Sequence, residues 1–266
     1  MTSYLAIGAV YRNEGRYLRE WIEFHRLVGV ERFFLYDNRS NDEHVEVLAP
    51  YIEAGVVVHH SWPGFPAQLQ VFDDCIERHR DDARWIAFID LDEFLFSPTM
   101  RPVAEILRDY EQHAAVGVNC VAFGTSGHET PPPGLVIENY LRRTDREARN
   151  LIIKSIVDPA RTLHAGRTPH YFRLRNHERA VTERGEPVRG DESDSLSCEL
   201  LRINHYFTRS QQERDAKIAS RRADNGLAKS DGSERDWKLN AVEDRTILSY
   251  LPALKDALAD RDPAAR

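Results

Sequence analysis

Short apolar runs alternate with longer segments of mixed polarity through the first 98 residues. The runs are rich in aliphatic and aromatic side chains and predict buried strands at residues 4–10, 32–36, 56–60 and 85–94. Between them, apolar residues recur every three or four positions, which predicts amphipathic helices. Strands and helices that alternate in this order form a parallel sheet with right-handed crossovers. The first half of the chain therefore predicts an α/β fold.

Capping and turn residues set the expected limits of the helices. Asn13 is expected to cap the first helix, with Glu14 favourably placed near its positive end. A helix over about residues 43–54 is expected to end at Gly55. Pro66 is expected to begin the third helix, because proline suits the first helical turn.

The pattern changes after the fourth strand. A helix is expected over about residues 102–113, and strands at residues 116–123, 151–157 and 200–207. The polar stretch 173–195 lacks periodicity, so we expect a mobile loop or an irregular flap. Ser210 and Glu213 have the spacing of a capping box and predict a helix. Residues 221–240 are expected to be loosely held, and residues 250–258 predict a last amphipathic helix.

Composition narrows the class of protein. The 266 residues are 41% hydrophobic and 30% charged, which is typical of a soluble globular protein. The formal net charge of −7, with scattered arginines, argues against a nucleic-acid binder. Three widely spaced cysteines predict neither a disulfide framework nor a zinc ribbon. No apolar run approaches the length of a membrane span and no signal peptide is evident, so we expect a cytoplasmic protein that could associate peripherally with a membrane.

An acidic pair follows the long apolar run of the fourth strand. Side chains two apart on a strand point the same way, so an extended backbone would present Asp90 and Asp92 on one side at the carboxyl end of a core strand. Adjacent carboxylates repel unless a cation lies between them, and a divalent metal that carries a phosphate ligand is the natural partner. The alternative is a turn-forming or helix-capping role. Among the histidines, His25 lies on an apolar helical stripe and is expected to be a satisfied core residue.

An ordered set of short segments resembles a known family. The segments are VYRNEG at 10–15, EW at 20–21, DNRS at 37–40, WIAFIDLDEF at 85–94, FGTSGH at 123–128, KSIV at 154–157, PH at 169–170 and NHY at 204–206. Together they look like GT-A glycosyltransferases and are most similar to glycosyltransferase family 92 and its bacterial relatives that border family 2. The resemblance implies a GT-A domain over residues 1–215, with a nucleotide-binding half to about residue 98 and a smaller, irregular acceptor and metal half after it. Residues 216–266 would form a helical extension on the same domain.

The resemblance also implies an activity. We expect a transferase that moves a sugar from a nucleoside-diphosphate sugar, with a UDP-sugar as the expected donor, to a glycan or other hydroxyl acceptor. Inversion at the anomeric carbon and dependence on Mn²⁺ or Mg²⁺ are implied with it. A metal that bridges the two phosphates stabilises the charge that develops as the nucleoside diphosphate leaves.

The resemblance also implies roles for individual residues, assigned by their position in the matching motifs. Asp92 should ligate the metal directly, and Asp90 should contact the ribose or reach the metal through water. His205 would be a later-arriving metal or diphosphate ligand, the alternative being a buried strand histidine bound to the backbone, and His170 is the reserve candidate. Lys154 could face the diphosphate or lie on a solvated face. The nucleoside pocket would be lined by Arg12, Asn13, Glu14, Asp37, Asn38, Arg39 and Gln68.

Inversion requires a base that takes the proton of the acceptor hydroxyl. Glu129 best fits that place, with His128 next, although a plain loop carboxylate is an open alternative. Two other functions compete. A haloacid-dehalogenase phosphatase would carry Thr or Val where Phe94 stands. A non-catalytic nucleotide- or glycan-binding protein on a transferase scaffold would keep the fold without turnover.

Overall fold

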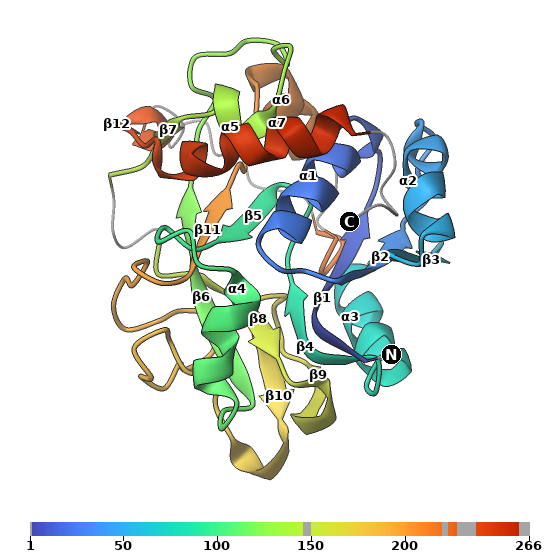
Figure 1. The fold of residues 1–266 in the computed structure, drawn as a ribbon, viewed down its shortest axis with the longest axis vertical. Coiled ribbons are helices and arrows are strands. Elements are labelled where there is room, and N and C mark those ends of the chain that lie inside the picture. Colours follow the sequence, from blue (N-terminus) through green and yellow to red (C-terminus); the bar gives the residue numbers. More distant parts are fainter. Residues whose placement is uncertain (1, 146–149, 220–222, 228–237, 261–266) are drawn as a thin grey trace.

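An eight-stranded sheet forms the centre of the chain (Figure 1). In the computed structural model, which describes residues 2–145, 150–219, 223–227 and 238–260, the strand order is β3-β2-β1-β4-β8-β6-β11-β5. Six strands run the same way, whereas β8 and β5 run antiparallel to their neighbours. This confirms the predicted α/β fold with a mostly parallel sheet. The strands are β1 (Ser3–Tyr11), β2 (Arg32–Asp37), β3 (Val57–Ser61), β4 (Ala83–Phe88), β5 (Glu93–Phe96), β6 (Ala115–Ala122), β8 (Ile153–Val157) and β11 (Arg202–His205).

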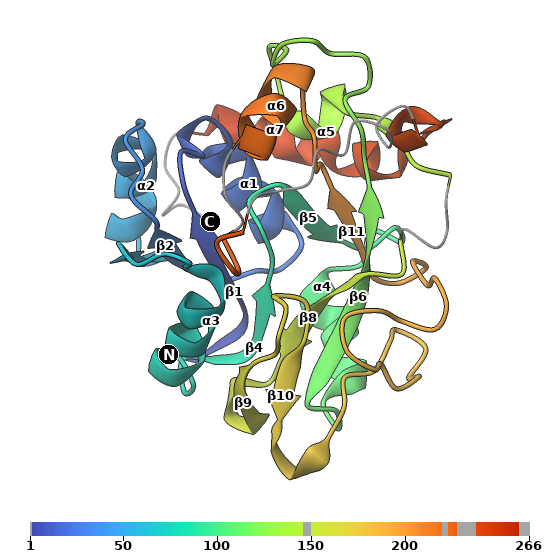
Figure 2. The same ribbon diagram turned by 180° about the vertical axis from the view of Figure 1, so that it is seen from behind.

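Two apolar clusters lie on opposite faces of the sheet. Successive residues of β1, β2 and β4 alternate between them, as the pleat requires. One face packs against α1 (Gly15–Leu27), α2 (His44–Glu53), α4 (Val103–Ile106), α5 (Val136–Asn139) and α7 (Leu251–Ala259). The other packs against α3 (Gln68–Arg78) and the hairpin of β9 (Thr162–Ala165) and β10 (Phe172–Leu174), as the reverse view in Figure 2 shows. At Gly8 a Cβ would lie 2.8 Å from the Phe88 ring and 3.0 Å from Cys75 Sγ of α3, so glycine permits this close packing.

Two predicted helix starts are wrong. Asn13 does not cap α1, because Glu14 holds the cap position and the Asn13 side chain accepts a hydrogen bond from Asn41 N at 2.8 Å. Its backbone has φ of 57°, outside the helical region. The third helix begins at Gln68 rather than Pro66. The helix expected over residues 102–113 is α4 followed by a short 3₁₀ turn, Leu107–Tyr110.

The predicted strand over residues 85–94 is two strands joined by a turn. The strand β4 ends at Phe88, Glu93 N donates to Asp90 O at 3.0 Å, and β5 then pairs with β11. In a flat sheet, β4 and β5 would lie four strand spacings, about 19 Å, apart. The four linking residues, 89–92, are folded into the turn and cannot span that distance. The sheet must therefore curl so that its last strand, β5, begins close to the end of β4. The acidic pair therefore lies in a turn and not on an extended strand.

The polar stretch 173–195 is irregular, as predicted, and it is attached to the sheet. Val181 N donates to Ala115 O at 3.0 Å, and Gly117 N donates to Val181 O at 2.8 Å. The buried Glu183 carboxylate accepts hydrogen bonds from Leu200 N at 2.8 Å and Leu201 N at 2.6 Å. These bonds connect the stretch to both β6 and the approach to β11.

The C-terminal segment packs on the same domain. The capping box of Ser210 and Glu213 begins α6 (Gln211–Ala219), as predicted, so the expected boundary at residue 215 falls inside this helix. Tyr250 OH donates to Ser97 O at 2.8 Å, and Arg19 Nη2 donates to Leu258 O of α7 at 2.8 Å. β7 (Arg142–Arg143) and β12 (Val242–Glu243) form a small separate pair. Most of residues 221–240 lies outside the described residues.

In the described part of the chain, no helix has both the length and the apolar character that a membrane crossing requires. The expected cytoplasmic location and peripheral membrane association stay predictions.

His25 is a satisfied core histidine, as predicted. Its Nδ1 donates to Trp21 O at 2.8 Å and its Nε2 accepts from Leu95 N at 3.0 Å, which fixes a neutral ring with the proton on Nδ1. Burial lowers the pKa of His25 to about 3. Its hydrogen bond to Leu95 holds the start of β5, just after the acidic turn.

We expect His25→Gln to flatten the dependence of stability on pH. Between the unfolded pKa near 6.5 and the folded value, only the unfolded chain binds this proton, so the free energy of unfolding falls by about 1 kcal/mol per pH unit as the solution is acidified. Glutamine does not titrate and removes this contribution. Urea unfolding at pH 7, 6 and 5 should show the difference between the two proteins narrowing with acidification. A constant difference would mean that His25 has the same pKa in the folded and unfolded chain.

Candidate active site

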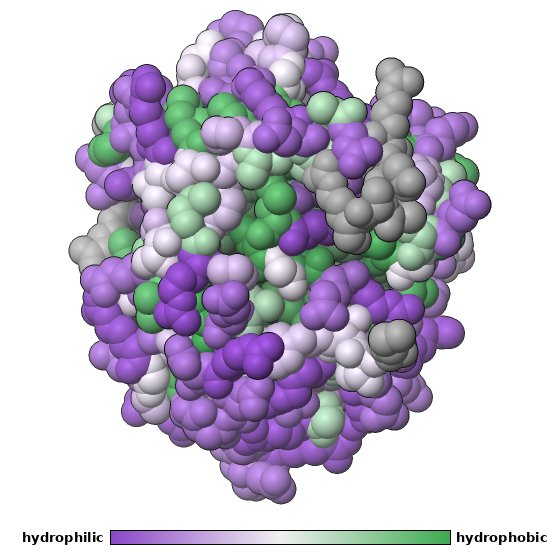
Figure 3. Space-filling model, in the orientation of Figure 1, coloured by the Kyte–Doolittle hydropathy of each residue, from purple (hydrophilic) through white to green (hydrophobic). Residues whose placement is uncertain are grey.

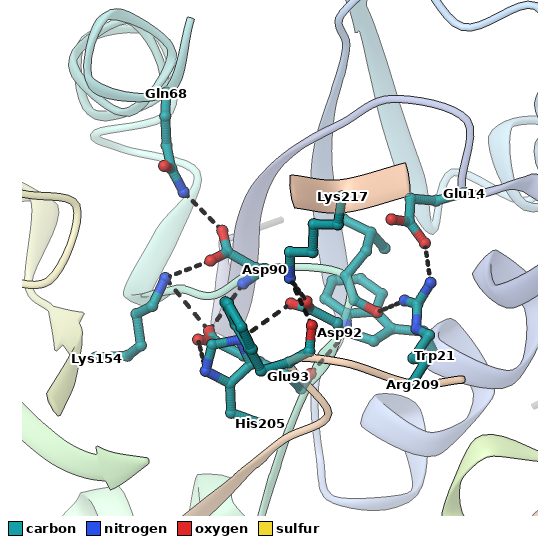
Figure 4. Close-up of polar contacts among 12 residues, drawn as sticks. Glu14, Trp21, Gln68, Asp90, Asp92, Glu93, Lys154, His205, Arg209 and Lys217 are labelled. Carbon is teal, nitrogen blue, oxygen red and sulfur yellow. Dashed lines mark hydrogen bonds and ion pairs between the residues drawn. The ribbon is translucent and has the colours of Figure 1, made fainter. Parts of the chain in front are cut away.

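Side chains from several helices and strands meet at the acidic turn (Figure 4). Asp90 and Asp92 follow β4, and Glu93 begins β5. Side chains from α3, β8, β11 and α6 converge on these carboxylates: Gln68, Lys154, His205 and Lys217. The acidic turn therefore lies at the carboxyl end of β4, as predicted.

Asp90 is held from two sides. Its Oδ1 accepts a hydrogen bond from Gln68 Nε2 at 2.6 Å, and its Oδ2 accepts one from Lys154 Nζ at 2.8 Å. The Asp90 side chain is 31% exposed. Each carboxylate oxygen has two lone pairs, so Asp90 retains the capacity to accept a further hydroxyl hydrogen bond.

Lys154 is the buried cation of the site. Its side chain is 1% exposed, and Nζ lies 3.4 Å from Glu93 Oε2 as well as contacting Asp90, so the solvated-face alternative is wrong. Burial alone would lower the pKa of Lys154, but the Asp90 and Glu93 carboxylates raise it above its ordinary value. Burial raises the pKa of Glu93, against the opposing charge of Lys154.

Asp92 lies between two groups from the second half of the chain. Its Oδ2 pairs with the Lys217 ammonium, and its Oδ1 lies 3.6 Å from His205 Nε2. The carboxylate is buried, which would raise its pKa, but Lys217 and then His205 hold the pKa of Asp92 well below its usual range. The other ring nitrogen of His205 lies 3.6 Å from Glu93 Oε1. Both nitrogens therefore face carboxylates rather than the backbone.

Arg209 connects the acidic turn to the first loop of the fold. Its Nη1 donates to Glu14 Oε2 at 2.7 Å, and its Nη2 donates to Leu91 O, between the two aspartates, at 3.1 Å. The buried guanidinium lies 3.8 Å from the centre of the Tyr17 ring. Arg209 thus fixes the backbone of the turn relative to β1 and α1.

The loops after β1 and β2 bind one another. Asn13 N donates to Ser40 Oγ at 2.8 Å, and Asp37 Oδ1 accepts from Ser40 N at 2.9 Å. Asn38 Nδ2 donates to Trp62 O at 2.6 Å and to Gly64 O at 2.8 Å. Asn13 Oδ1, which accepts from Asn41 N, and Asn38 Nδ2 thus hold these loops, whereas the Arg12 and Arg39 side chains are exposed. Contacts of these loops with a nucleotide stay predictions.

The two candidate bases lie in the loop before α5. The Glu129 side chain is exposed and, within the described residues, contacts none of the charged groups around the turn. His128 Nε2 lies 3.2 Å from Asn139 O, and its ring meets Tyr140 edge to face. His170, the reserve metal ligand, is oriented by Ile153 O, 3.0 Å from its Nδ1. Burial, and after it the charge of Lys154, lowers the pKa of His170.

The donor set at Asp92 suits a divalent cation that is also bound by phosphate. In the described ranges, no group of three or more His, Cys, Asp and Glu side chains is arranged to hold a metal by itself. Mg²⁺ and similar ions often take only one or two protein ligands and complete their shell with phosphate oxygens and water. Asp92 Oδ1, in the turn before β5, and His205 Nε2, at the end of β11, would be two such ligands. Glu93 Oε1, buried beside His205, has no hydrogen-bond partner and orients toward this imidazole.

Three charged residues of the site escaped the sequence analysis. Glu93 stands in the quoted acidic segment, but its position beside the pair did not distinguish it from a surface residue. Arg209 directly precedes the capping box of α6, and nothing in local spacing marks it. Lys217 lies on a helix that is polar nearly all round, 125 positions from its partner Asp92.

Comparisons with known proteins agree on one family. The family model described as glycosyltransferase family 92 matches residues 7–190. A glycosyltransferase family 92 protein of Oryza sativa subsp. japonica is 32% identical over 207 residues, which cover 76% of this chain and 33% of the relative. A family 92 protein of Ricinus communis is 34% identical over 209 residues, 76% of this chain and 35% of the relative. Galactan beta-1,4-galactosyltransferase GALS2 of Arabidopsis thaliana is 35% identical over 107 residues, 36% of this chain and 21% of the relative.

The chain spans about a third of the length of the first two of these relatives. Among solved structures, S. aureus TarS 1-349 in complex with UDP-GlcNAc matches with a TM-score of 0.41 and 12% identity, over 63% of this chain and 50% of that chain. A likeness this distant supports no conclusion about this chain. The sequence comparisons confirm the resemblance inferred from the ordered motifs.

Proposed function

The chain belongs to glycosyltransferase family 92, and we propose that it is a metal-dependent glycosyltransferase that uses a nucleoside-diphosphate sugar. The expected donor is a UDP-sugar and the acceptor a hydroxyl group, with inversion at the anomeric carbon. The observation that carries the proposal is the acidic turn after β4, where Asp92 and His205 lie side by side and Asp90 is oriented by Lys154 and Gln68. Family membership excludes the haloacid-dehalogenase alternative.

Each charged group has a role in this scheme. Asp92 and His205 would hold a divalent cation, which supplies positive charge where the leaving diphosphate becomes more negative. Asp90 has free lone pairs on a carboxylate fixed from two sides, which suits acceptance of ribose hydroxyl hydrogen bonds. Arg209 holds Leu91 O, so the two aspartates keep their relative positions. Lys217, which pairs with Asp92, would add positive charge near the diphosphate.

Glu129 remains our choice for the base. Its backbone carbonyl accepts a hydrogen bond from Gln212 N at 3.0 Å, and His128 O accepts one from Gln211 N at 2.9 Å, so this loop is joined to the first turn of α6. The same helix carries Lys217, five positions after Gln212 and thus about 7.5 Å along the helix axis. An exposed carboxylate in this loop is free to meet an acceptor hydroxyl.

We expect Glu129→Gln to leave donor binding intact and to slow sugar transfer by about 10²-fold or more, because the amide cannot take the proton of the acceptor. Steady-state transfer rates and calorimetric UDP affinity should be measured on the same preparation. Normal transfer by the variant would show that Glu129 is not the base, and His128→Gln would be the next variant to measure.

A screen of nucleotides tests the proposed function itself. A ligand that binds the native state at 100 times its Kd stabilises it by about 2.7 kcal/mol, which shifts the Tm by several degrees. We expect UDP and UDP-sugars to raise the Tm in the presence of Mn²⁺ and to have little effect after chelation. A binding-only protein would show the same shift but release no nucleoside diphosphate with any acceptor. No shift with any nucleotide would contradict the proposal.

A further inference from the structure

A second groove opens on the face of the sheet that packs against α3. It has a volume of about 600 Å³ and is bounded by the β9–β10 hairpin and by segment 177–190. Apolar side chains line part of it, namely Phe172, Leu174, Ala180 and Val188. In Figures 1 and 2 the hairpin lies at the end of the molecule away from α5, α6 and α7. Figure 3 shows that this end is mostly hydrophilic on the face it draws.

Three arginines line this groove: Arg173, Arg179 and Arg189. Within the described ranges, none of the three forms an ion pair with a carboxylate. The one acidic lining residue, Glu178, is engaged by Arg161, whose Nε donates to its Oε2 at 3.1 Å. The groove thus carries uncompensated positive charge in a chain of net charge −7. Such segregated charge attracts anions to one place on the surface.

The walls of the groove are fixed by hydrogen bonds. On one side, Val188 N donates to Ala180 O at 2.8 Å, and the neighbouring Val181 is bonded to β6. On the other side, Gly166 N donates to Tyr171 O at 2.8 Å across the hairpin. A Cβ at Gly166 would lie 2.5 Å from the Tyr171 ring, so glycine lets this ring lie flat on the hairpin. The groove is therefore largely formed before any ligand arrives.

We propose that this groove binds a linear glycan that carries carboxylate groups. Its volume lies in the range of about 300–1,000 Å³ that is typical of ligand sites. The planar guanidinium forms paired hydrogen bonds with carboxylates, and three of them along one groove suit a ligand whose charge repeats. The apolar floor and the Tyr171 ring suit the C–H faces of sugar rings. A long nucleic acid is disfavoured by the net negative charge of the chain.

The groove and the acidic turn share one strand. Ser155 lines the groove and follows Lys154 of the site directly in β8. Ser155 Oγ donates to His170 O at 2.8 Å, which connects the hairpin to this strand. Because successive strand residues point to opposite faces, Ser155 and Lys154 face different sides of β8, and the groove binds its glycan apart from the acidic turn. The binding itself does not depend on catalysis.

The test compares the binding of two hexasaccharides that differ only at C6 of each sugar. A β-1,4-linked oligoglucuronate carries six carboxylates, and cellohexaose carries neutral hydroxymethyl groups instead. We expect the full chain to bind the oligoglucuronate at least about tenfold more tightly by calorimetry, with an affinity that falls as NaCl is added. R173Q/R179Q/R189Q should lose about tenfold, since each exposed pair contributes a factor of two to three. The matched control R101Q/R108Q/R245Q changes three arginines outside the groove and should stay within about twofold.

Two readouts separate this inference from the proposed function. UDP binding with Mn²⁺ should be unchanged in the groove variant, which also shows that it is folded. Failure of UDP to bind the unaltered chain would reject the proposed function but would not bear on the inference that the groove binds a glycan. Equal affinity of the unaltered chain and the groove variant for oligoglucuronate would overturn the groove assignment, as would equal affinity for cellohexaose. Binding of inorganic phosphate or anionic vesicles without oligoglucuronate would likewise reject a glycan ligand.

Discussion

Asp92→Asn should abolish Mn²⁺-dependent binding of UDP and reduce sugar transfer by about 10³-fold or more. Asparagine keeps the size of the side chain but removes the negative charge that attracts the cation. His205 alone then remains as a protein ligand at this place, 3.6 Å from the former carboxylate oxygen. The loss should appear in calorimetric titration of UDP with Mn²⁺ and in the rate of UDP release from the donor.

Asp109→Asn is a matched control for this experiment. The Asp109 side chain is 70% exposed and lies 3.9 Å from Arg101, away from the acidic turn. The control should bind UDP and turn over as the unaltered chain does. Circular dichroism should confirm that Asp92→Asn folds, since Lys217 and His205 lose their counter-charge in this variant. Unaltered Mn²⁺-dependent UDP affinity in Asp92→Asn would remove Asp92 from the metal site.

Lys154→Met should lower the free energy of unfolding by about 3–5 kcal/mol at neutral pH, the usual cost of leaving a buried charge without its partner. Methionine fills the space of the lysine stem but leaves Asp90 and the fully buried Glu93 without a cation. Because protonated carboxylates carry no charge, the loss should shrink as the pH is lowered. Urea unfolding at pH 7 and pH 5 measures both effects.

Lys255→Met provides the comparison for Lys154. Lys255 pairs with Glu138 at 2.6 Å, but its side chain is 56% exposed, so its removal should cost less than about 1 kcal/mol. A similar small cost for Lys154→Met would mean that water reaches the buried carboxylates. In that case Lys154 would contribute little to the position of Asp90.

Local pattern predicted the elements of residues 1–98 well because each strand there is short and strongly apolar. The alternation of β1, β2 and β4 between two apolar faces follows from the pleat, and the crossover helices follow from the spacing of their apolar residues. The position of the acidic pair at the end of β4 follows from the same pattern. Its conformation does not, because the turn depends on β5 pairing with β11, more than 100 residues later.

The charged partners of the acidic turn could not be predicted from spacing. Lys217 and Arg209 reach the turn only because α6 packs over it, and this packing is a property of the tertiary fold. Asn13 and Asn38, which the family resemblance places in the nucleoside pocket, stay predictions as nucleotide contacts. In the structure their side chains also bind neighbouring backbone and so hold the shape of the loops, which the spacing of residues did not predict.

The central claim is that Asp92 and His205 seat a cation which a nucleoside diphosphate also binds. A crystal of the full chain grown with UDP and Mn²⁺, measured at the manganese absorption edge, tests this most directly. We predict one strong anomalous peak about 2.2 Å from both Asp92 and His205, with diphosphate density beside it. A peak at another place, or bound UDP with Asp92 still held only by Lys217, would contradict the account.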